Sequence, residues 1–229
     1  MGRRKVEQGQ GMNLVSLEHG RAGYWSDFAL YGAVVTGLST ALVWASPRSL
    51  WEENAALVLL GLGLCSLGEY MFHRFVLHGL QPFRRWHARH HVSPRALISA
   101  PTVLSASLIA AFIFAPALWL VGPWPATALT LGVITGYLAY ALVHHATHHW
   151  RAKSIWLKQR KRWHALHHNV QAECCYGVTT GLWDHVFGTA RPHRVGNRQR
   201  ASVGQRTYSA RLGEHHSSVR APVQCKTDE

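Results

Sequence analysis

The sequence predicts an all-α integral membrane protein, built as a four-helix transmembrane bundle with a helical cap on one side. Only 15% of its 229 residues are charged and 48% are hydrophobic, whereas soluble domains carry roughly 25% charged residues. The charges also avoid four long apolar segments, in which Glu69 is the only Asp, Glu, Lys or Arg. These segments are residues 28–45, 55–72, 97–121 and 126–143.

Each apolar segment is long enough to cross a bilayer. Three contain 18 residues and the third along the chain contains 25, and about 20 helical residues span the hydrocarbon layer. Buried helices of a soluble protein are the alternative, but four nearly uncharged helices would leave little polar surface to cover them. Pro101 and Pro116 are expected to bend the third span. Gly61, Gly63 and Gly68 are expected to be helix-packing positions within the second.

The distribution of basic residues predicts the topology. Four Lys or Arg residues precede the first span, five lie between the second and third, and fourteen follow the fourth, whereas the two other connections hold only Arg48. By the positive-inside rule, both termini and the central loop are cytosolic. This topology also accounts for the net charge of +13, so we expect no nucleic-acid partner.

The chain divides into three regions. Residues 1–24 form a polar N-terminal tail, residues 25–190 form the membrane domain, and residues 191–229 form a basic tail whose composition predicts disorder.

Ten of the 17 histidines fall into four groups. Residues i, i+3 and i+4 share one face of a helix, so each HxxHH motif presents three imidazoles together. The first pair is spaced i, i+5, about 140° apart on a regular helix, and therefore requires a helix end or a distortion. The groups are His73 and His78; His87, His90 and His91; His144 and His148; and His164, His167 and His168.

The predicted topology brings all four groups to the cytosolic side. His73 and His144 stand where the second and fourth spans reach the cytosol, and the two triplets lie in the central loop and after the last span. Neutral imidazoles bind borderline metals such as iron, zinc and copper. Ten ligands exceed the four of a structural zinc site and suit two ions with five each. The sequence therefore predicts a histidine-rich di-metal site in the cytosolic cap.

The spacing also predicts how the ligands divide between the ions. In each triplet the outer pair lies on one side of the helix face and the middle residue on the other, so the pair and the middle residue can serve different ions. One predicted set is His73, His78, His87, His91 and His167. The other is His144, His148, His164, His168 and His90.

Ligating histidines usually give their second ring proton to an oxygen acceptor. Glu69 lies one turn before His73 and is expected to be such an acceptor. Asp184 is a further candidate, although a helix cap or a salt bridge would equally explain it, and Tyr140 is also expected beside the ligands. His145 and His149 lie off the shared face and are expected around the site or at the surface.

These residues resemble the motifs of the fatty acid hydroxylase and sterol desaturase superfamily, and within it those of the fatty acid 2-hydroxylases. The resemblance covers about residues 28–189. It is carried by EYMFHRFVLH (69–78), WHARHH (86–91), GYLAYALVHHATH (136–148), HALHH (164–168) and YGVTTGLWDHVFGT (176–189). It implies two non-haem metal ions, with iron expected and zinc an alternative in purified protein. It also implies O2 as co-substrate and oxidation of a lipid C–H bond.

The sequence departs from this family in three places. Fatty acid 2-hydroxylases often carry a fused haem-binding domain for which this chain has no room, so the resemblance implies a separate electron-donor protein. The basic residues Lys158, Arg160, Lys161 and Arg162 are the predicted docking face for it. The family tends to have Tyr-Asp where this chain has Tyr140-Ala141, and often Asn-Phe-Gly where it has Cys175-Tyr176-Gly177. These two departures leave the identity of the lipid substrate open.

Three functions remain in view from the sequence. A lipid hydroxylase acting on a fatty acyl chain is expected first, with sterol oxidation or desaturation as an alternative. A carotenoid ring hydroxylase uses a similar histidine set, but the segment from Gly181 to Thr189 points away from it. A non-catalytic membrane protein that binds or transports metal would need ligands at the bilayer midplane, whereas these lie beyond the span ends.

Overall fold

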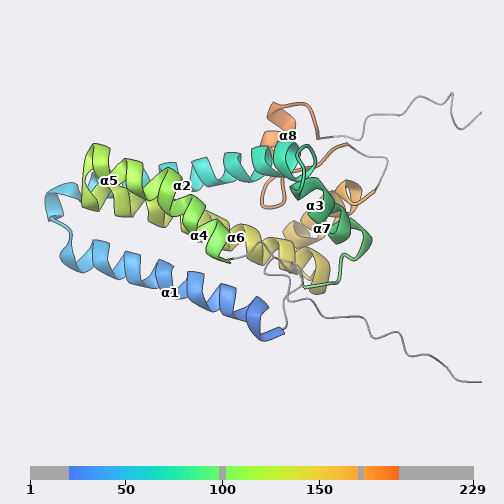
Figure 1. Cartoon of the computed structure of the whole chain (residues 1–229), viewed down its shortest axis with the longest axis horizontal. Helices are drawn as coiled ribbons and strands as arrows, with labels where there is room; N and C mark the ends of the chain where they lie inside the picture. The colour runs from blue at the N-terminus through green and yellow to red at the C-terminus, as the bar shows by residue number, and fades with distance from the viewer. Residues whose placement is uncertain (1–20, 98–101, 170–172, 191–229) are drawn as a thin grey trace, which may run out of the picture.

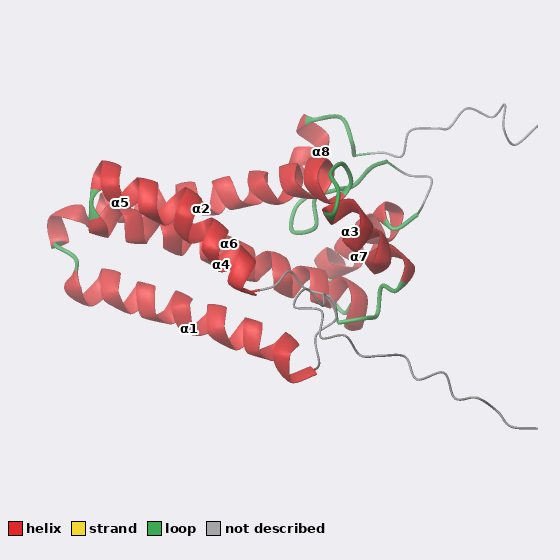
Figure 2. Ribbon diagram, viewed as in Figure 1, coloured by secondary structure: helices red, strands yellow, loops and turns green. Residues whose placement is uncertain are grey.

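The computed structural model describes residues 21–97, 102–169 and 173–190, and every regular element in these ranges is a helix (Figures 1 and 2). The tails predicted at 1–24 and 191–229 lie almost wholly outside the described residues. In chain order the elements are α1 (Arg21–Ala45), η1 (Arg48–Leu50), α2 (Trp51–Met71), η2 (Phe72–Leu77), α3 (Phe83–Val92), α4 (Thr102–Ile109), η3 (Ala110–Phe114), α5 (Ala115–Val121), α6 (Pro123–His149), α7 (Ile155–His167) and α8 (Leu182–Val186).

Four helical stretches are long and apolar enough to cross a membrane, which confirms the predicted four-span architecture. They are Arg21–Ala45, Arg48–Leu77, Thr102–Val121 and Pro123–His149. Large apolar side chains such as Trp44, Val103 and Trp119 point away from the protein with 80–86% of their surface exposed. Exposed apolar area on this scale requires lipid rather than water around the bundle. The chain is an integral membrane protein.

The second and fourth spans form the centre of the bundle and approach most closely at two glycines. A Cβ atom at Gly61 would lie 2.3 Å from the Leu129 carbonyl oxygen, and one at Gly132 would lie 2.2 Å from that of Val58. Only glycine permits this backbone approach, as is usual between membrane helices. The same role predicted for Gly63 and Gly68 is wrong, because a Cβ at either position meets nothing within 4 Å.

The third span accommodates Pro116 by widening the turn before it. Proline has no N–H to bond the carbonyl four residues earlier, and the preceding turn, η3, is a π-helix. Pro101 lies outside the described residues. The span ends at Gly122, whose φ of 82° suits glycine, and α6 begins at the next residue.

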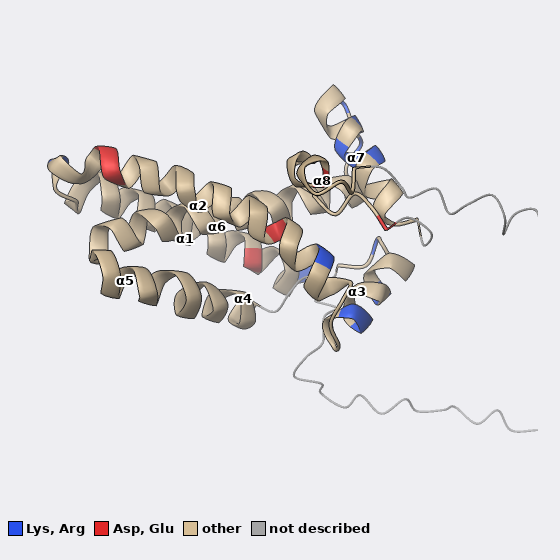
Figure 3. Ribbon diagram, turned by 90° about the horizontal axis from the view of Figure 1, so that it is seen from above, with Lys and Arg blue, Asp and Glu red and all other residues tan. Residues whose placement is uncertain are grey.

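The cap lies at the end of the bundle where α1 and α4 begin and where η2 and α6 end (Figure 1). It contains α3 and α7, with α8 beside the last part of α2. Figure 3 shows the Lys and Arg positions gathered at this end, with Arg48 at the opposite one. Ser154 starts α7 by accepting a hydrogen bond from the Leu157 N–H at 3.1 Å, as expected for an N-cap serine.

Candidate metal centre

The first histidine pair is brought together by a π-helical turn. The backbone N–H of His78 donates to the carbonyl of His73 at 3.2 Å, an i→i+5 hydrogen bond that winds one extra residue into the turn. Residues five apart then lie nearly one above the other, and the two ring centroids are 5.4 Å apart. The distortion expected from the spacing is present as the last turn of the second span.

Five of the ten histidines converge as one group, from η2, α3 and α7. The Nε2 atom of His87 lies 3.0 Å from those of both His73 and His91, and the Nε2 atoms of His78 and His167 are 3.1 Å apart. Ligand nitrogens of His73, His78, His87 and His167 all lie within 4.8 Å of one another. Nitrogens this close, all turned to one point, could hold a metal ion.

The other five converge as a second group, from α3, α6 and α7. The Nε2 atom of His164 lies 2.8 Å from that of His148 and 3.0 Å from that of His168. The Nε2 atoms of His90 and His144 are 3.1 Å apart. Four of these residues, His90, His148, His164 and His168, again have ligand nitrogens within 4.8 Å of one another. This group could hold a second ion.

The cap environment keeps these imidazoles neutral. Burial, with smaller contributions from neighbouring histidines, lowers the pKa of His90 to about 2 and that of His168 to about 3. Burial lowers the pKa of His78 to about 4, helped by His91 and Arg84. Burial also holds the pKa values of His87, His164 and His167 well below the usual range for histidine. A neutral ring has the free lone pair that metal binding requires.

Two rings of the first group have backbone acceptors for their outer nitrogens. The Nδ1 atom of His73 lies 2.5 Å from the carbonyl oxygen of Tyr176, and that of His167 lies 3.1 Å from the carbonyl oxygen of Cys174. A ring that donates from Nδ1 is fixed in the tautomer that presents Nε2 to an ion. This corrects the expected role of Glu69, because the acceptor beside His73 is a carbonyl and not that carboxylate.

Glu69 and Asp184 instead hold the segment that carries these carbonyls. The N–H groups of Tyr176 and Gly177 donate to the two oxygens of Asp184, each at 2.8 Å. The next two N–H groups, those of Val178 and Thr179, donate to one oxygen of Glu69 at 2.6 and 3.0 Å. The Thr179 hydroxyl donates to the other Glu69 oxygen. Both acids therefore act on the histidines through this segment.

The segment 174–179 packs closely enough for both carboxylates to reach its backbone. Its residues 174–178 are buried, and a Cβ atom at Gly177 would lie 2.0 Å from the Thr180 carbonyl oxygen and 2.9 Å from Asp184. Asp184 is wholly buried and also accepts hydrogen bonds from the Thr189 hydroxyl at 2.7 Å and from the Trp163 indole at 3.4 Å. A buried carboxylate is stable only when its oxygens are satisfied in this way.

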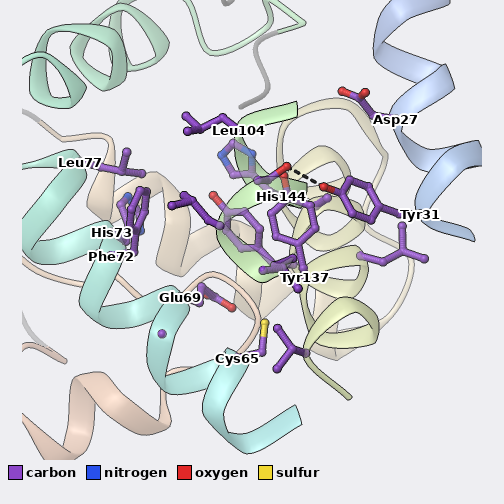
Figure 4. Close-up of a pocket in the computed structure, with 18 of the residues that line it drawn as sticks. Asp27, Tyr31, Cys65, Glu69, Phe72, His73, Leu77, Leu104, Tyr137 and His144 are labelled. Atoms are coloured by element: carbon purple, nitrogen blue, oxygen red, sulfur yellow. Dashed lines mark hydrogen bonds between the residues drawn. The ribbon is translucent and has the colours of Figure 1, made fainter. Parts of the chain in front are cut away.

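An apolar cavity of about 430 Å³ runs from the histidines into the bundle (Figure 4). At one end its wall includes a histidine from each group, His73 and His144. It extends along α6 to Val133, eleven residues from His144 and thus roughly 16 Å away. Leu64 and Leu104 line it and are also exposed, so it opens sideways toward the lipid.

The cavity wall contains a few polar side chains among the apolar ones. The hydroxyls of Tyr31 and Ser105 lie 2.6 Å apart (Figure 4). The Thr102 hydroxyl donates to Asp27, and these two contacts join α1 to α4. Tyr140 also lines the cavity, and its ring stacks on that of His144 at 5.8 Å. Its predicted place beside the ligands therefore agrees with its position.

His145 and His149 lie outside the two groups. The Nδ1 atom of His145 is 3.0 Å from the Tyr24 hydroxyl, and His149 is exposed with its ring stacked on that of His145 at 4.5 Å. Sequence reasoning missed the carbonyls of Cys174 and Tyr176 as acceptors. No side-chain pattern marks a backbone oxygen, so only the folded path of the segment reveals it.

Comparison with known proteins agrees with this architecture. The profile of the family described as fatty acid hydroxylase matches residues 58–189, more than half of the chain. The chain belongs to the fatty acid hydroxylase family. The resemblance noted in the sequence is thereby confirmed, and the matched range contains all ten histidines, Glu69 and Asp184.

Two relatives and one solved structure illustrate how this chain is related to other members of the family. A dihydroceramide fatty acyl 2-hydroxylase of Arabidopsis thaliana is 32% identical over 161 residues, which cover 63% of this chain and 65% of that protein. A ceramide very long chain fatty acid hydroxylase of Schizosaccharomyces pombe is 33% identical over 148 residues, which cover 58% of this chain and 42% of that protein. The chain thus spans about two-thirds or less of these relatives. The structure of full-length scs7p, in which only the hydroxylase domain is visible, has a TM-score of 0.64 at 24% identity over 74% of this chain and 67% of that chain.

Proposed function

We propose that this protein is a membrane-bound, O2-dependent di-metal hydroxylase of lipid acyl chains. The observation that carries the proposal is the meeting of two neutral histidine groups with an apolar cavity that opens to the bilayer. Membership of the fatty acid hydroxylase family, and relatives named as fatty acyl 2-hydroxylases, support the same chemistry.

The ten histidines fit two non-haem metal ions. Five neutral imidazoles in each group supply the nitrogen ligands that iron and zinc accept, and the carbonyls of Tyr176 and Cys174 fix two of the rings. We assign His73, His78, His87, His91 and His167 to one ion. We assign His144, His148, His164, His168 and His90 to the other. Iron is the expected metal for O2 chemistry, since zinc has no redox chemistry of its own.

The protein's own contribution is placement and exclusion of water. Two bound iron ions would supply the activation of O2 and the oxidation of a C–H bond. The apolar walls beside Phe72 and Leu138 would hold an extended acyl chain with one of its carbons next to the histidines. A dry, fixed position for the reacting carbon is the part of catalysis that a protein scaffold provides.

The proposed function predicts that narrowing the cavity changes which lipids are hydroxylated. Gly68 lines the cavity and a Cβ there meets nothing within 4 Å, so Gly68→Leu should place its side chain in the acyl path with no clash at the Cβ. We expect product to fall about tenfold or to shift to shorter chains. Mass spectrometry of lipids from cells producing each variant measures this.

Gly63→Leu is the matched control, because Gly63 lies on the same helix, has equally open space around it and does not line the cavity. It should give the wild-type product pattern. If cells with and without the wild-type protein show the same acyl lipids, the hydroxylase proposal fails. Hydroxylated sterols or carotenoids in their place would identify one of the alternative substrates.

We propose that the histidine end of the molecule faces the cytosol. Among the described residues, every Lys and Arg except Arg48 lies at that end of the bundle or in its cap, and this asymmetry is the usual determinant of orientation. Modification of an introduced thiol at Lys158 by an impermeant reagent would report the side directly.

We further propose that an acidic electron-donor protein docks on the exposed basic residues of the cap. Lys158 and Arg162 are exposed on α7, whereas Arg160, expected on the same face, is buried with its guanidinium 5.4 Å from the ring centroid of Trp163. Reversing both exposed charges, in Lys158→Glu with Arg162→Glu, should slow electron transfer from the native donor about tenfold at low salt. The difference should shrink as salt screens it.

The measurement is the rate of product formation with donor at limiting concentration. Arg48→Glu is the control, because Arg48 is exposed at the opposite end and its reversal should leave the rate unchanged. Rates that depend on neither salt nor the α7 charges would show that these residues serve only topology and lipid contact.

A further inference from the structure

The short helix α8 exposes an apolar face at the side of the molecule. Leu182 and Val186, spaced i, i+4 and so on one face, are 55% and 60% exposed, and Phe187 beside them is 45% exposed. His185, which carries no charge when its ring is neutral, is the exposed polar residue on this face. Residues 173–190 contain no Lys or Arg, in a chain of net charge +13. Asp184 of this helix is wholly buried. The outer surface of α8 is therefore unlike that of α3 and α7, which carry the basic residues.

Hydrogen bonds fix this apolar face beside a membrane span. The Trp183 indole N–H donates to the Ser66 hydroxyl of α2 at 3.0 Å. Ser66 lies eight residues before Arg74, the basic residue at the histidine end of the second span, and so about 12 Å toward the bilayer from it. Figures 1 and 3 both place α8 alongside the last part of α2. In this part of the span the ring of Tyr70 stacks on that of Phe187, and Met71 and Phe75 are also exposed and apolar.

Many polar groups of the irregular backbone before α8 form their hydrogen bonds within the protein. Four successive N–H groups, from Tyr176 to Thr179, are taken by the carboxylates of Asp184 and Glu69. The carbonyls of Cys174 and Tyr176 accept from histidine rings. Non-helical backbone is tolerated at membrane depth only when its polar groups are satisfied within the protein, and these six backbone groups meet that condition.

From these observations we propose that α8 and the turn before it lie in the lipid leaflet on the histidine side, with Leu182, Val186 and Phe187 among the acyl chains. An apolar helix face at the boundary of headgroups and acyl chains is the usual form of such an interfacial contact. Lipid then covers the outer side of the segment whose carbonyls bond to His73 and His167. The membrane itself would thus close one side of the histidine site.

Thiol labelling tests this placement in purified protein reconstituted into phosphatidylcholine liposomes. Leu182→Cys and Val186→Cys are compared with Lys158→Cys, an exposed position on the same side of the membrane. A charged maleimide should label positions 182 and 186 at least about tenfold more slowly than position 158. All three should react fully after denaturation, and peptide mass mapping separates the introduced thiols from the native cysteines, which are Cys65, Cys174, Cys175 and Cys225.

A positive readout comes from bimane attached at the same positions in detergent before reconstitution. Lipids with a nitroxide on the upper acyl chain should quench bimane at 182 and 186 several-fold more than at 158. Labelling of 182 and 186 as fast as 158, or quenching no stronger than at 158, would overturn the proposal. Such a result in liposomes without other proteins would mean that the apolar face of α8 stays in contact with water, and that its function is to bind a protein partner. Neither readout depends on metal content or turnover.

Discussion

Replacing His148 with alanine should abolish turnover and lower metal content, whereas replacing its neighbour His149 should do neither. The Nε2 atom of His148 lies 2.8 Å from that of His164, within the second histidine group, while the exposed ring of His149 stacks on His145. Loss of a partner that merely orients a ligand costs about 10–100-fold in metal affinity or activity, so loss of a ligand should cost more. His90→Ala and His167→Ala, one from each group, should behave like His148→Ala.

Two measurements separate metal loss from misfolding. Elemental analysis of the purified variants should show less metal per chain than in the wild type, and the spans should still insert, because the four apolar helices do not depend on the cap. The adjacent pair His148 and His149 makes the comparison strict, since both substitutions remove the same side chain from the same turn of α6. Wild-type activity and metal content in His90→Ala and His167→Ala would exclude the proposed site.

Asp184→Asn should disturb the first histidine group although Asp184 touches none of its rings. The Asp184 carboxylate accepts hydrogen bonds from two backbone N–H groups, a hydroxyl and an indole. An amide in its place turns an NH2 toward one of these donors and removes a charge, which should cost roughly 2–4 kcal/mol of stability. The segment 174–177 would loosen, and with it the carbonyls that fix His73 and His167.

The expected outcome is a lower melting temperature together with loss of metal from one group, so that content falls from two ions toward one per chain. His185→Asn is the control, since His185 lies next to Asp184 in α8 but is exposed, and it should leave metal content unchanged. A variant that melts earlier but keeps both ions would show that Asp184 stabilises the fold without orienting the ligands.

The assembly of the histidines could be foreseen because helical spacing and span count are both periodic features. HxxHH fixes three rings on one face, and an even number of spans brings His73, His144 and both triplets to one side of the membrane. The i, i+5 spacing of His73 and His78 also predicted a distortion, which the structure shows as a π-helical turn. These expectations use only local geometry, so they needed no knowledge of distant contacts.

The roles of Glu69, Asp184 and the glycines could not be assigned in the same way. Glu69 was expected to accept a hydrogen bond from the ring of His73 one turn away. Its oxygens instead accept hydrogen bonds from residues more than a hundred positions later in the chain. Gly61, Gly63 and Gly68 are indistinguishable in an apolar segment, but only Gly61 meets another helix, and Gly68 lines the cavity. Which neighbour a side chain meets depends on how the spans rotate and pack.

The sequence by itself determined the four spans, the meeting of the histidines at one end of the bundle and the division of the triplets, because apolar length, span number and helical period act along the chain. Only the tertiary structure decided which backbone carbonyls orient His73 and His167, where the apolar cavity runs and that α8 lies against α2. These features arise from contacts between segments far apart in sequence. The residues that make these contacts follow no periodic pattern along the chain, so the sequence does not indicate which partner each one contacts.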